Sequence, residues 1–259
     1  MKISLVISTY DRPDSLAKAF SGFQHQTRWP DEILLSDDGS GEPTKQLIAQ
    51  FAAAAPVPVR HIWQPHDGFR KTIILNETLV AASGDYLIFT DGDCVPHPRF
   101  VADHAALAER GFWVQGRRCF VREKFAPEFE PGQIVVWQWM LTGKISGAIK
   151  GIRWGVPIIR RDTGQRGIIG CNMAFWREDL VAVNGFDEDY SGWGIEDSDL
   201  GTRLYHLGRH RKFVYGRAIT FHLNHPRLPR DQHAANLTRL AETIRTRKIR
   251  CEHGLDRHH

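Results

Sequence analysis

The chain has 259 residues, of which 42% are hydrophobic and 25% are charged, and its formal net charge is +4 at pH 7. This length allows one large or two small globular domains, and the ordinary composition excludes a disordered or low-complexity chain. The mild positive charge favours an anionic partner, but it is too small for a dedicated nucleic-acid binder.

The N-terminus and the cysteines indicate the compartment. The first apolar run, ISLVIS, is short and charged residues follow at once, so we expect neither a signal peptide nor a membrane span there. The four cysteines, Cys94, Cys119, Cys171 and Cys251, are scattered without metal-type or redox-type spacing. We therefore expect free thiols in a reducing, cytoplasmic compartment.

Short apolar runs alternate with segments of helical period through the first half of the chain. The apolar runs predict strands at ISLVIS (3–8), EILLS (32–36), VRHIW (59–63) and YLIFT (86–90). The segments between them predict helices at 14–23, 43–55 and 71–83, the last ended by Gly84. This alternation is typical of βαβ units, and it predicts an α/β fold with a mostly parallel, Rossmann-like central sheet flanked by helices.

Polar residues gather where three of these strands end, in STYDR (8–12), SDDGS (36–40) and TDGDC (90–94). Ligands of parallel sheets bind beyond the carboxyl ends of the strands. Three strands therefore bring aspartates to one edge of the sheet, and we expect a ligand site there.

The second half, from about Gly111, is less regular. It holds WVQGRRCFV (113–121), a basic and aromatic-rich stretch (125–166), GCNMAFWREDLVAVNGF (170–186), AITFHLNHP (218–226) and a final helical segment (233–250). No linker separates the halves, so we expect one continuous unit. The stretch 125–166 is either a cover over the active site or a contact surface for a lipid-linked or anionic acceptor at a membrane.

The strand ends carry candidate ligand-binding residues, although no glycine-rich phosphate loop follows any strand. Asp91 and Asp93 could hold a divalent cation and a sugar hydroxyl, or they could simply form a tight turn. Asp38 could accept a hydrogen bond from a nucleobase. Arg70 could pair with a diphosphate, or it could be a solvated charge in a loop.

The stretch GWGIEDSD (192–199) precedes a predicted helix. Acids favour a helix N-terminus, which explains one or two of Glu196, Asp197 and Asp199 without any function. The flanking glycines let the Trp193 indole move, and an indole face is a good platform for a sugar ring. A carboxylate beside it could act as general base on a sugar hydroxyl.

Two histidines follow in FHLNH (221–225). A lone histidine is more often structural than a ligand. Downstream of an acid-rich site, however, His222 could complete a metal shell, and His225 is the weaker candidate.

With these motifs in order, the first half resembles the inverting family-2 glycosyltransferases of the GT-A fold, through SLVISTYDRP, ILLSDDGS, GFRKTIILN and YLIFTDGDC. The second half resembles the galactosyltransferase-type segment of chondroitin-polymerase-like enzymes and animal β-1,4-galactosyltransferases. The matching motifs are GCNMAFWREDL, NGFDEDYSGWGIEDSDLGTRL and FHLNH. The resemblance covers roughly residues 1–125 and 168–226.

The resemblance implies a UDP-sugar donor and Mn²⁺ or Mg²⁺. Carried over by position, the nucleotide-binding residues would be Ser8, Tyr10, Arg12, Asp38, Arg70 and Asp91. Trp193 and Gly194 would contact the sugars, Asp93 and His222 would bind metal, Asp197 would be the catalytic base, and Glu196 would hold sugar hydroxyls. Ile195 stands where the animal enzymes have glycine, so the hinge could be stiffer, and Ser198 stands where they have another acid.

We therefore predict a GT-A glycosyltransferase with a nucleotide-sugar-binding half (1–110) and an acceptor-binding, catalytic half (111–259). The acceptor would be a glycan or a lipid-linked glycan, with possible peripheral contact at the inner face of the membrane, and the pathway would be polysaccharide or lipopolysaccharide synthesis. Two alternatives are a sugar-nucleotide nucleotidyltransferase and a non-catalytic nucleic-acid-binding protein. STYDRPDS has no glycine for the phosphate loop of the former, and the crowded acids would repel the phosphates of the latter.

Overall fold

The structure is a computed structural model that describes residues 1–129, 136–164, 167–225 and 231–258. An eight-stranded sheet crosses the molecule in the order β3-β2-β1-β4-β10-β6-β11-β9. Its strands are β1 (Ile3–Thr9), β2 (Glu32–Asp37), β3 (Val59–Trp63), β4 (Tyr86–Asp91), β6 (Phe112–Gln115), β9 (Ile158–Asp162), β10 (Asn172–Trp176) and β11 (His210–Tyr215). All are mutually parallel except β9 and β10, so the prediction of a mostly parallel sheet is confirmed.

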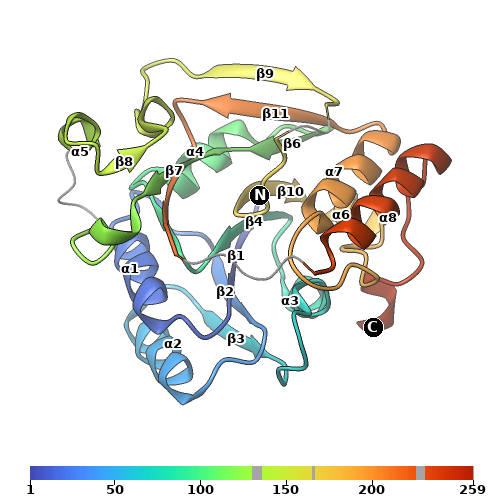
Figure 1. The fold of residues 1–259 in the computed structure, drawn as a ribbon, viewed down its shortest axis with the longest axis horizontal. Coiled ribbons are helices and arrows are strands. Elements are labelled where there is room, and N and C mark those ends of the chain that lie inside the picture. The colour runs from blue at the N-terminus through green and yellow to red at the C-terminus, as the bar shows by residue number, and fades with distance from the viewer. Residues whose placement is uncertain (130–135, 165–166, 226–230, 259) are drawn as a thin grey trace.

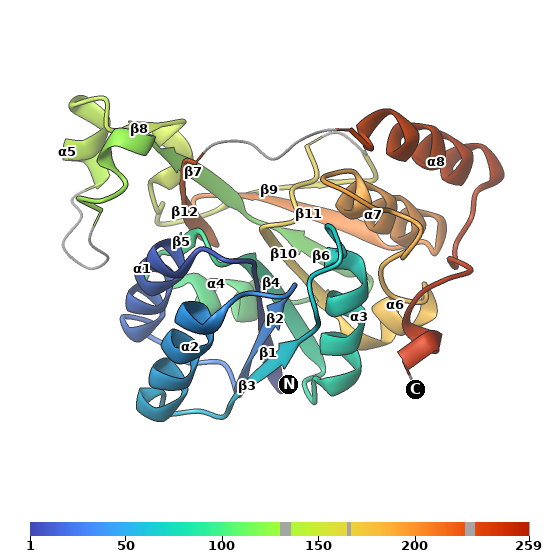
Figure 2. The ribbon, with the colours of Figure 1, turned by 60° about the horizontal axis from the view of Figure 1, so that its bottom comes forward.

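Helices cover both faces of this sheet (Figures 1 and 2). The helices α1 (Pro13–Gln24), α2 (Glu42–Ala54) and α4 (Phe100–Leu107) pack on one face, and α3 (Lys71–Ala81), α6 (Arg177–Ala182) and α7 (Glu196–His206) pack on the other. The helix α8 (His233–Thr246) lies against α7. The four predicted strands and three predicted helices of the first half are confirmed, with α3 ending at Ala81 rather than running to Ser83.

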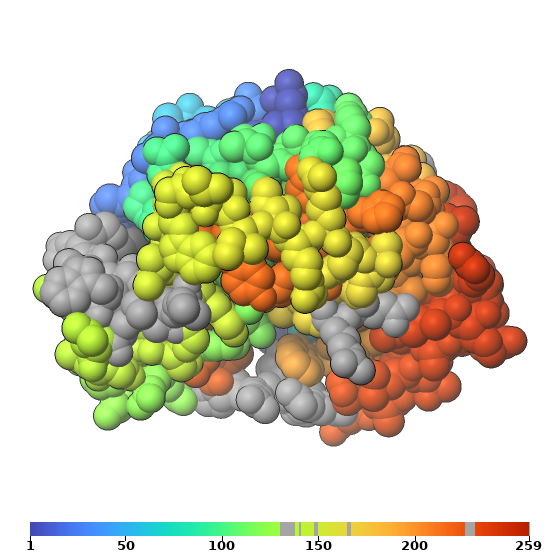
Figure 3. Space-filling model, turned by 90° about the horizontal axis from the view of Figure 1, so that it is seen from above, coloured from blue at the N-terminus to red at the C-terminus, as the bar shows by residue number. Residues whose placement is uncertain are grey.

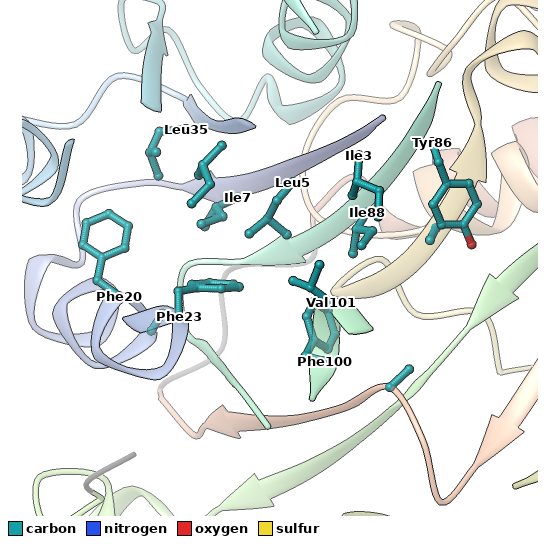
Figure 4. Packing of buried hydrophobic residues seen from close by; sticks show 14 of the residues in the cluster. Ile3, Leu5, Ile7, Phe20, Phe23, Leu35, Tyr86, Ile88, Phe100 and Val101 are labelled. Carbon is teal, nitrogen blue, oxygen red and sulfur yellow. The ribbon is translucent and has the colours of Figure 1, made fainter. Parts of the chain in front are cut away.

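Alternation along β1 explains why the sheet has a core on each side. Ile3, Leu5 and Ile7 point into the cluster under α1 and α4, which Figure 4 shows with Phe20, Phe23, Phe100 and Val101 around them. Val6 points the other way, into the cluster that holds Leu75 and Leu79 of α3. Because both faces are buried, Leu5, Val6 and Ile7 follow one another as apolar residues rather than alternating with polar ones.

A second, four-stranded sheet has the order β5-β12-β7-β8. It contains β5 (Cys94–Pro96), β7 (Arg117–Val121), β8 (Ile145–Ser146) and β12 (Ile219–Leu223). Its own small core includes Val95, Cys119, Phe129 and Phe221. The strand β5 begins three residues after Asp91 at the end of β4, so the small sheet continues directly from the predicted ligand edge.

The stretch 125–166 contains α5 (Val136–Leu141), β8, a short 3₁₀ helix (Ala148–Gly151) and the edge strand β9, and residues 130–135 and 165–166 lie outside the described part. Figure 3 looks down on β9 (yellow) beside the α5–β8 region (yellow-green). Val156 and Ile158 are 81% and 57% exposed there. Whether this stretch meets an acceptor or a membrane stays a prediction, as does the division of the chain at residue 110.

Two further expectations concern the cysteines and the membrane. Cys94, Cys119, Cys171 and Cys251 are buried free thiols in the structure, as expected. Among the described residues, none of the helices combines the length and the apolar character that crossing a bilayer requires.

Candidate active site

The first edge of the site is formed where β2, β1 and β4 lie side by side. Their register sets Ser8 opposite Asp91, and Thr9 opposite Asp37. Ser8 Oγ donates to Asp91 Oδ1 at 2.6 Å, and Lys71 Nζ donates to the same oxygen at 2.8 Å. The three strand ends therefore meet as expected, and Lys71, to which the sequence assigned no role, joins them from the start of α3.

A second group surrounds Asp38. Its carboxylate accepts hydrogen bonds from the backbone N–H of Arg70, at 2.9 Å, and from the side chain of Gln64. Burial raises the pKa of Asp38, although these hydrogen bonds act in the opposite direction. Tyr10 stacks on His66 with ring centroids 4.3 Å apart, and His66 Nδ1 lies 3.1 Å from the Asp38 carbonyl oxygen. Tyr10 and Asp38 are thus connected through His66.

The two arginines predicted for the nucleotide lie differently. The Arg70 guanidinium donates to the carbonyl oxygen of Pro65 at 2.6 Å and lies 3.8 Å from Asp67. It is thereby engaged with its own loop. Arg12 is half-buried at the start of α1, and its guanidinium makes no hydrogen bond or ion pair with a described residue. Their contact with a nucleotide stays a prediction.

Asp93, His222 and His225 form a group suited to a divalent cation, with their ligand atoms all within 4.8 Å of one another. His225 Nε2 is 2.9 Å from Asp93 Oδ2, and His222 Nε2 is 3.6 Å from it. Burial acts to raise the pKa of Asp93, but the His225 hydrogen bond and the two imidazoles hold it at about 2. Burial lowers the pKa of His222. An ionised carboxylate and a neutral imidazole are the forms that bind metal, so these residues fit the expected cation, and His225 belongs beside His222.

Glu196 and Asp197 occupy the first turn of α7. Burial, together with the neighbouring charge of Asp197, raises the pKa of Glu196 to about 7, and burial also raises the pKa of Asp197. Burial acts to lower the pKa of Lys71, but the carboxylates of Asp91 and Glu196 outweigh this effect and raise the pKa overall. Lys71 therefore links the acids of the two halves electrostatically.

A small cavity joins the two halves at this point. Ser8, Lys71 and Thr90 line it from the first half, and Gly170, Glu196 and Asp197 line it from the second. A Cβ at Gly170 would lie 3.6 Å from the Asp197 carboxylate, so glycine leaves the approach to that carboxylate open. Perturbed carboxyl groups in a cleft are typical of catalytic sites.

The loop before α7 holds an unusual backbone. Gly192, Gly194 and Ile195 have φ of 70°, 96° and 82°. Glycine adopts such values freely, whereas a β-branched residue there is strained. From α8, the Asn236 side chain donates to the carbonyl oxygens of Ser191 and Gly194, both at 3.0 Å, and so fixes the loop that carries the 40% exposed Trp193.

Comparison with known proteins decides the family. The family described as "Glycosyl transferase family 2" matches residues 4–180, which is more than half of the chain. The chain belongs to glycosyl transferase family 2. A second family, described as "N-terminal domain of galactosyltransferase", matches residues 155–226, which include the loop and both histidines.

Relatives of this family-2 chain include a chondroitin synthase and a glucosyltransferase. It is 24% identical over 242 residues to a chondroitin synthase of Escherichia coli, covering 86% of this chain and 35% of that protein. It is 26% identical over 223 residues to a validoxylamine A glucosyltransferase of Streptomyces hygroscopicus subsp. limoneus, covering 80% of this chain and 48% of that protein. The chain thus spans less than half the length of either relative.

Solved structures show the same fold. GalNAc-T7, determined with UDP, GalNAc and Mn²⁺, matches with a TM-score of 0.68 at 15% identity, covering 94% of this chain and 48% of that one. The mannosyltransferase PcManGT of Pyrobaculum calidifontis, determined with GDP-Man and Mn²⁺, matches with a TM-score of 0.62 at 16% identity, covering 94% and 64%. The predicted GT-A glycosyltransferase fold is confirmed.

Proposed function

We propose that this family-2 glycosyltransferase moves a hexose or N-acetylhexosamine from a UDP-sugar to a hydroxyl of a glycan acceptor, with inversion at the anomeric carbon. One observation carries the proposal. The cation-binding group of Asp93, His222 and His225 and the half-buried acid pair Glu196 and Asp197 are linked through Asp91 and Lys71. The site thus offers one place for a diphosphate and another for base catalysis.

The first half would bind the nucleotide. Asp38, held by Gln64 and by the backbone of Arg70, would accept a hydrogen bond from the base, and Tyr10 would pack against the uracil ring. Ser8 and Asp91 would contact the ribose or the donor sugar. Arg12 and Arg70 would complete this side of the site.

The second half would perform the transfer. Asp197 would take the proton of the acceptor hydroxyl, whose oxygen attacks the anomeric carbon from the face opposite UDP. Glu196, with its pKa of about 7, would hold a sugar hydroxyl, and Trp193 and Gly194 would lie against the sugars. A divalent cation on Asp93, His222 and His225 would offset the charge of the departing diphosphate.

The relatives also support a proposal for the acceptor and the pathway. A chondroitin synthase and a hyaluronan synthase are among them, and this supports a glycan acceptor in bacterial surface polysaccharide or lipopolysaccharide synthesis. A lipid-linked acceptor would bring the protein to the inner face of the membrane from the cytoplasm. Membership in family 2 favours the transferase over both the nucleotidyltransferase and the nucleic-acid-binding alternatives.

Thermal shifts with UDP, GDP, CDP and dTDP, each with Mn²⁺ and again with EDTA, test this proposal. A ligand at a hundred times its dissociation constant adds about 2.7 kcal/mol of stability. We expect a shift with UDP that EDTA abolishes. A preference for GDP, the nucleotide in PcManGT, would keep the transferase but replace its donor. No shift with any nucleotide would overturn the proposed site.

A further inference from the structure

Arg118 on β7 points toward the candidate active site. Side chains alternate along a strand, so Arg118 and Phe120 share one face while Cys119 points into the small core. The register of β7 with β12 sets Phe120 opposite His222. The Phe120 ring meets the His222 ring edge-on, with centroids 5.5 Å apart, and lies 4.8 Å from the Arg118 guanidinium carbon. Arg118 therefore lies beside the cation-binding group.

The same guanidinium also reaches toward the acid pair. Arg118 Nη1 donates to Cys171 Sγ at 3.4 Å. Cys171 directly follows Gly170, the residue that faces the Asp197 carboxylate. Arg118 thus spans the space between the metal ligands and the proposed base, which is where a leaving diphosphate has to lie.

Arg118 has no ion-pair partner among the described carboxylates. Arg203, Arg211 and Arg153, which are also buried or half-buried, each pair with an aspartate. The thiol of Cys171 is a weak acceptor, and the other N–H groups of the Arg118 fork meet no oxygen acceptor among the described residues. The rest of the Arg118 fork is therefore open to the oxygens of an anionic ligand.

We propose that Arg118 binds the terminal phosphate of the nucleoside diphosphate, the group that leaves with the nucleotide. The planar fork of arginine matches two phosphate oxygens, and the cation would stabilise the charge that develops as the glycosidic bond breaks. Arg70, the arginine expected to do this from the sequence, donates instead to Pro65 in its own loop. This assignment rests on the proposed function, because it requires a nucleotide-diphosphate donor.

Arg117 provides a matched control. It precedes Arg118 on the same strand but points to the other face, where its guanidinium carbon lies 4.5 Å and 4.7 Å from the ring centroids of Phe213 and Tyr215. Substituting either arginine removes the same charge and fork from the same strand. Only Arg118 can touch the ligand.

The experiment titrates UMP and UDP, each with Mn²⁺, into the wild type, Arg118→Gln, Arg118→Lys, Arg117→Gln and Arg117→Lys. UDP carries the terminal phosphate and UMP lacks it. We expect Arg118→Gln to weaken UDP binding at least about tenfold and to leave UMP binding unchanged. Arg118→Lys, which keeps the charge without the fork, should fall between, and both Arg117 variants should bind like the wild type.

Four outcomes separate this inference from the function on which it rests. Unchanged UDP affinity in Arg118→Gln would overturn the inference alone, and so would an equal loss for UMP and UDP. If Arg118→Gln does not fold, the titrations of Arg118→Lys test the inference instead. A ratio of UDP to UMP affinity in Arg118→Lys that equals the wild-type ratio would contradict a role for the guanidinium fork. A wild type that binds neither nucleotide would overturn the proposed function as well.

Discussion

The two edges of the site are built in different ways. In the first half, Ser8, Asp37 and Asp91 lie at the ends of three adjacent parallel strands, so sheet register alone brings them together. In the second half, Asp197 comes from the first turn of a helix, and His222 comes from a strand of the small sheet. His225 lies just beyond that strand. Only long-range packing can bring these three into one place.

The two edges also differ in how well their carboxylates are paired. Asp37 accepts hydrogen bonds from the backbone N–H and the hydroxyl of Ser40, and it lies 2.8 Å from His61. In the second half, Glu196 Oε2 is buried without a hydrogen-bond partner in the described part of the chain. An unpaired carboxylate oxygen in a cleft is typical of a catalytic site. The first edge is therefore suited to binding and the second to chemistry.

The largest expected effect is the loss of transfer when the proposed base, Asp197, is substituted, and it should separate catalysis from nucleotide binding. Asp197→Asn should lower the rate of transfer about 10²- to 10⁴-fold, because the amide cannot take the proton of the acceptor hydroxyl. UDP affinity should stay within about twofold of wild type. Asp38→Asn, the counterpart in the first half, should show the reverse pattern, with weaker UDP binding.

Initial rates and UDP titrations on the same preparations measure this contrast. Ser198→Ala is the control, because Ser198 adjoins Asp197 and its hydroxyl donates to Asp197 only at 3.2 Å. A folded Asp197→Asn that no longer binds UDP would contradict the division between a binding edge and a reacting edge.

The same contrast explains how much the sequence could predict. The strands and helices of the first half, and the meeting of Ser8 with Asp91, follow from local periodicity and from the rule for parallel sheets. Periodicity does not show that β10 enters antiparallel between β4 and β6, so the layout of the second half came from the structure. Its site residues were found through motifs rather than through geometry.

Several functional candidates had no local signal at all. Lys71, Gln64 and His66 acquire their roles from partners across the sheet edge, namely Asp91 and Asp38. Likewise, His225 ranked below His222 until the structure placed both imidazoles at Asp93. In RRCFV, two adjacent arginines look alike, and only the direction of each side chain distinguishes Arg118 from Arg117.

An intermediate effect concerns stability and pH. The pKa of Glu196 is about 7 in the folded protein, against an ordinary 4.5, so the fold favours its protonated form. As pH rises from about 4.5 to about 7, the ionised group increasingly destabilises the fold, and above that range the cost is constant. Glu196→Gln removes this cost. We expect it to raise the free energy of unfolding by up to roughly 3 kcal/mol at pH 8 and to leave it unchanged at pH 4.

Urea unfolding at both pH values measures this gain. Glu242→Gln on α8 is the control, because hydrogen bonding to Arg245 lowers the pKa of Glu242, so its substitution should bring no gain at pH 8. Equal stability of Glu196→Gln and wild type at pH 8 would show that the second edge carries no stored electrostatic cost.

The smallest effect tests backbone strain in the loop before α7. Among the described residues before position 110, Asp11 alone of the non-glycine residues has a positive φ, and aspartate tolerates that conformation through its short polar side chain. Ile195 has a φ of 82° but a branched, apolar side chain that does not stabilise this conformation. Ile195→Gly relieves the strain but also loses side-chain packing, so the net change should stay within about 1 kcal/mol. The sharper comparison is between Ile195→Gly and Ile195→Ala, because both variants lose the packing and only alanine retains a Cβ.

Urea unfolding should find the glycine variant about 1 kcal/mol more stable than the alanine variant. If the two are equally stable, the left-handed conformation costs nothing, and the loop is no more strained than the strand ends of the first half. A stable glycine variant with a raised KM for the acceptor would instead show that Ile195 holds Trp193 in place for the sugars.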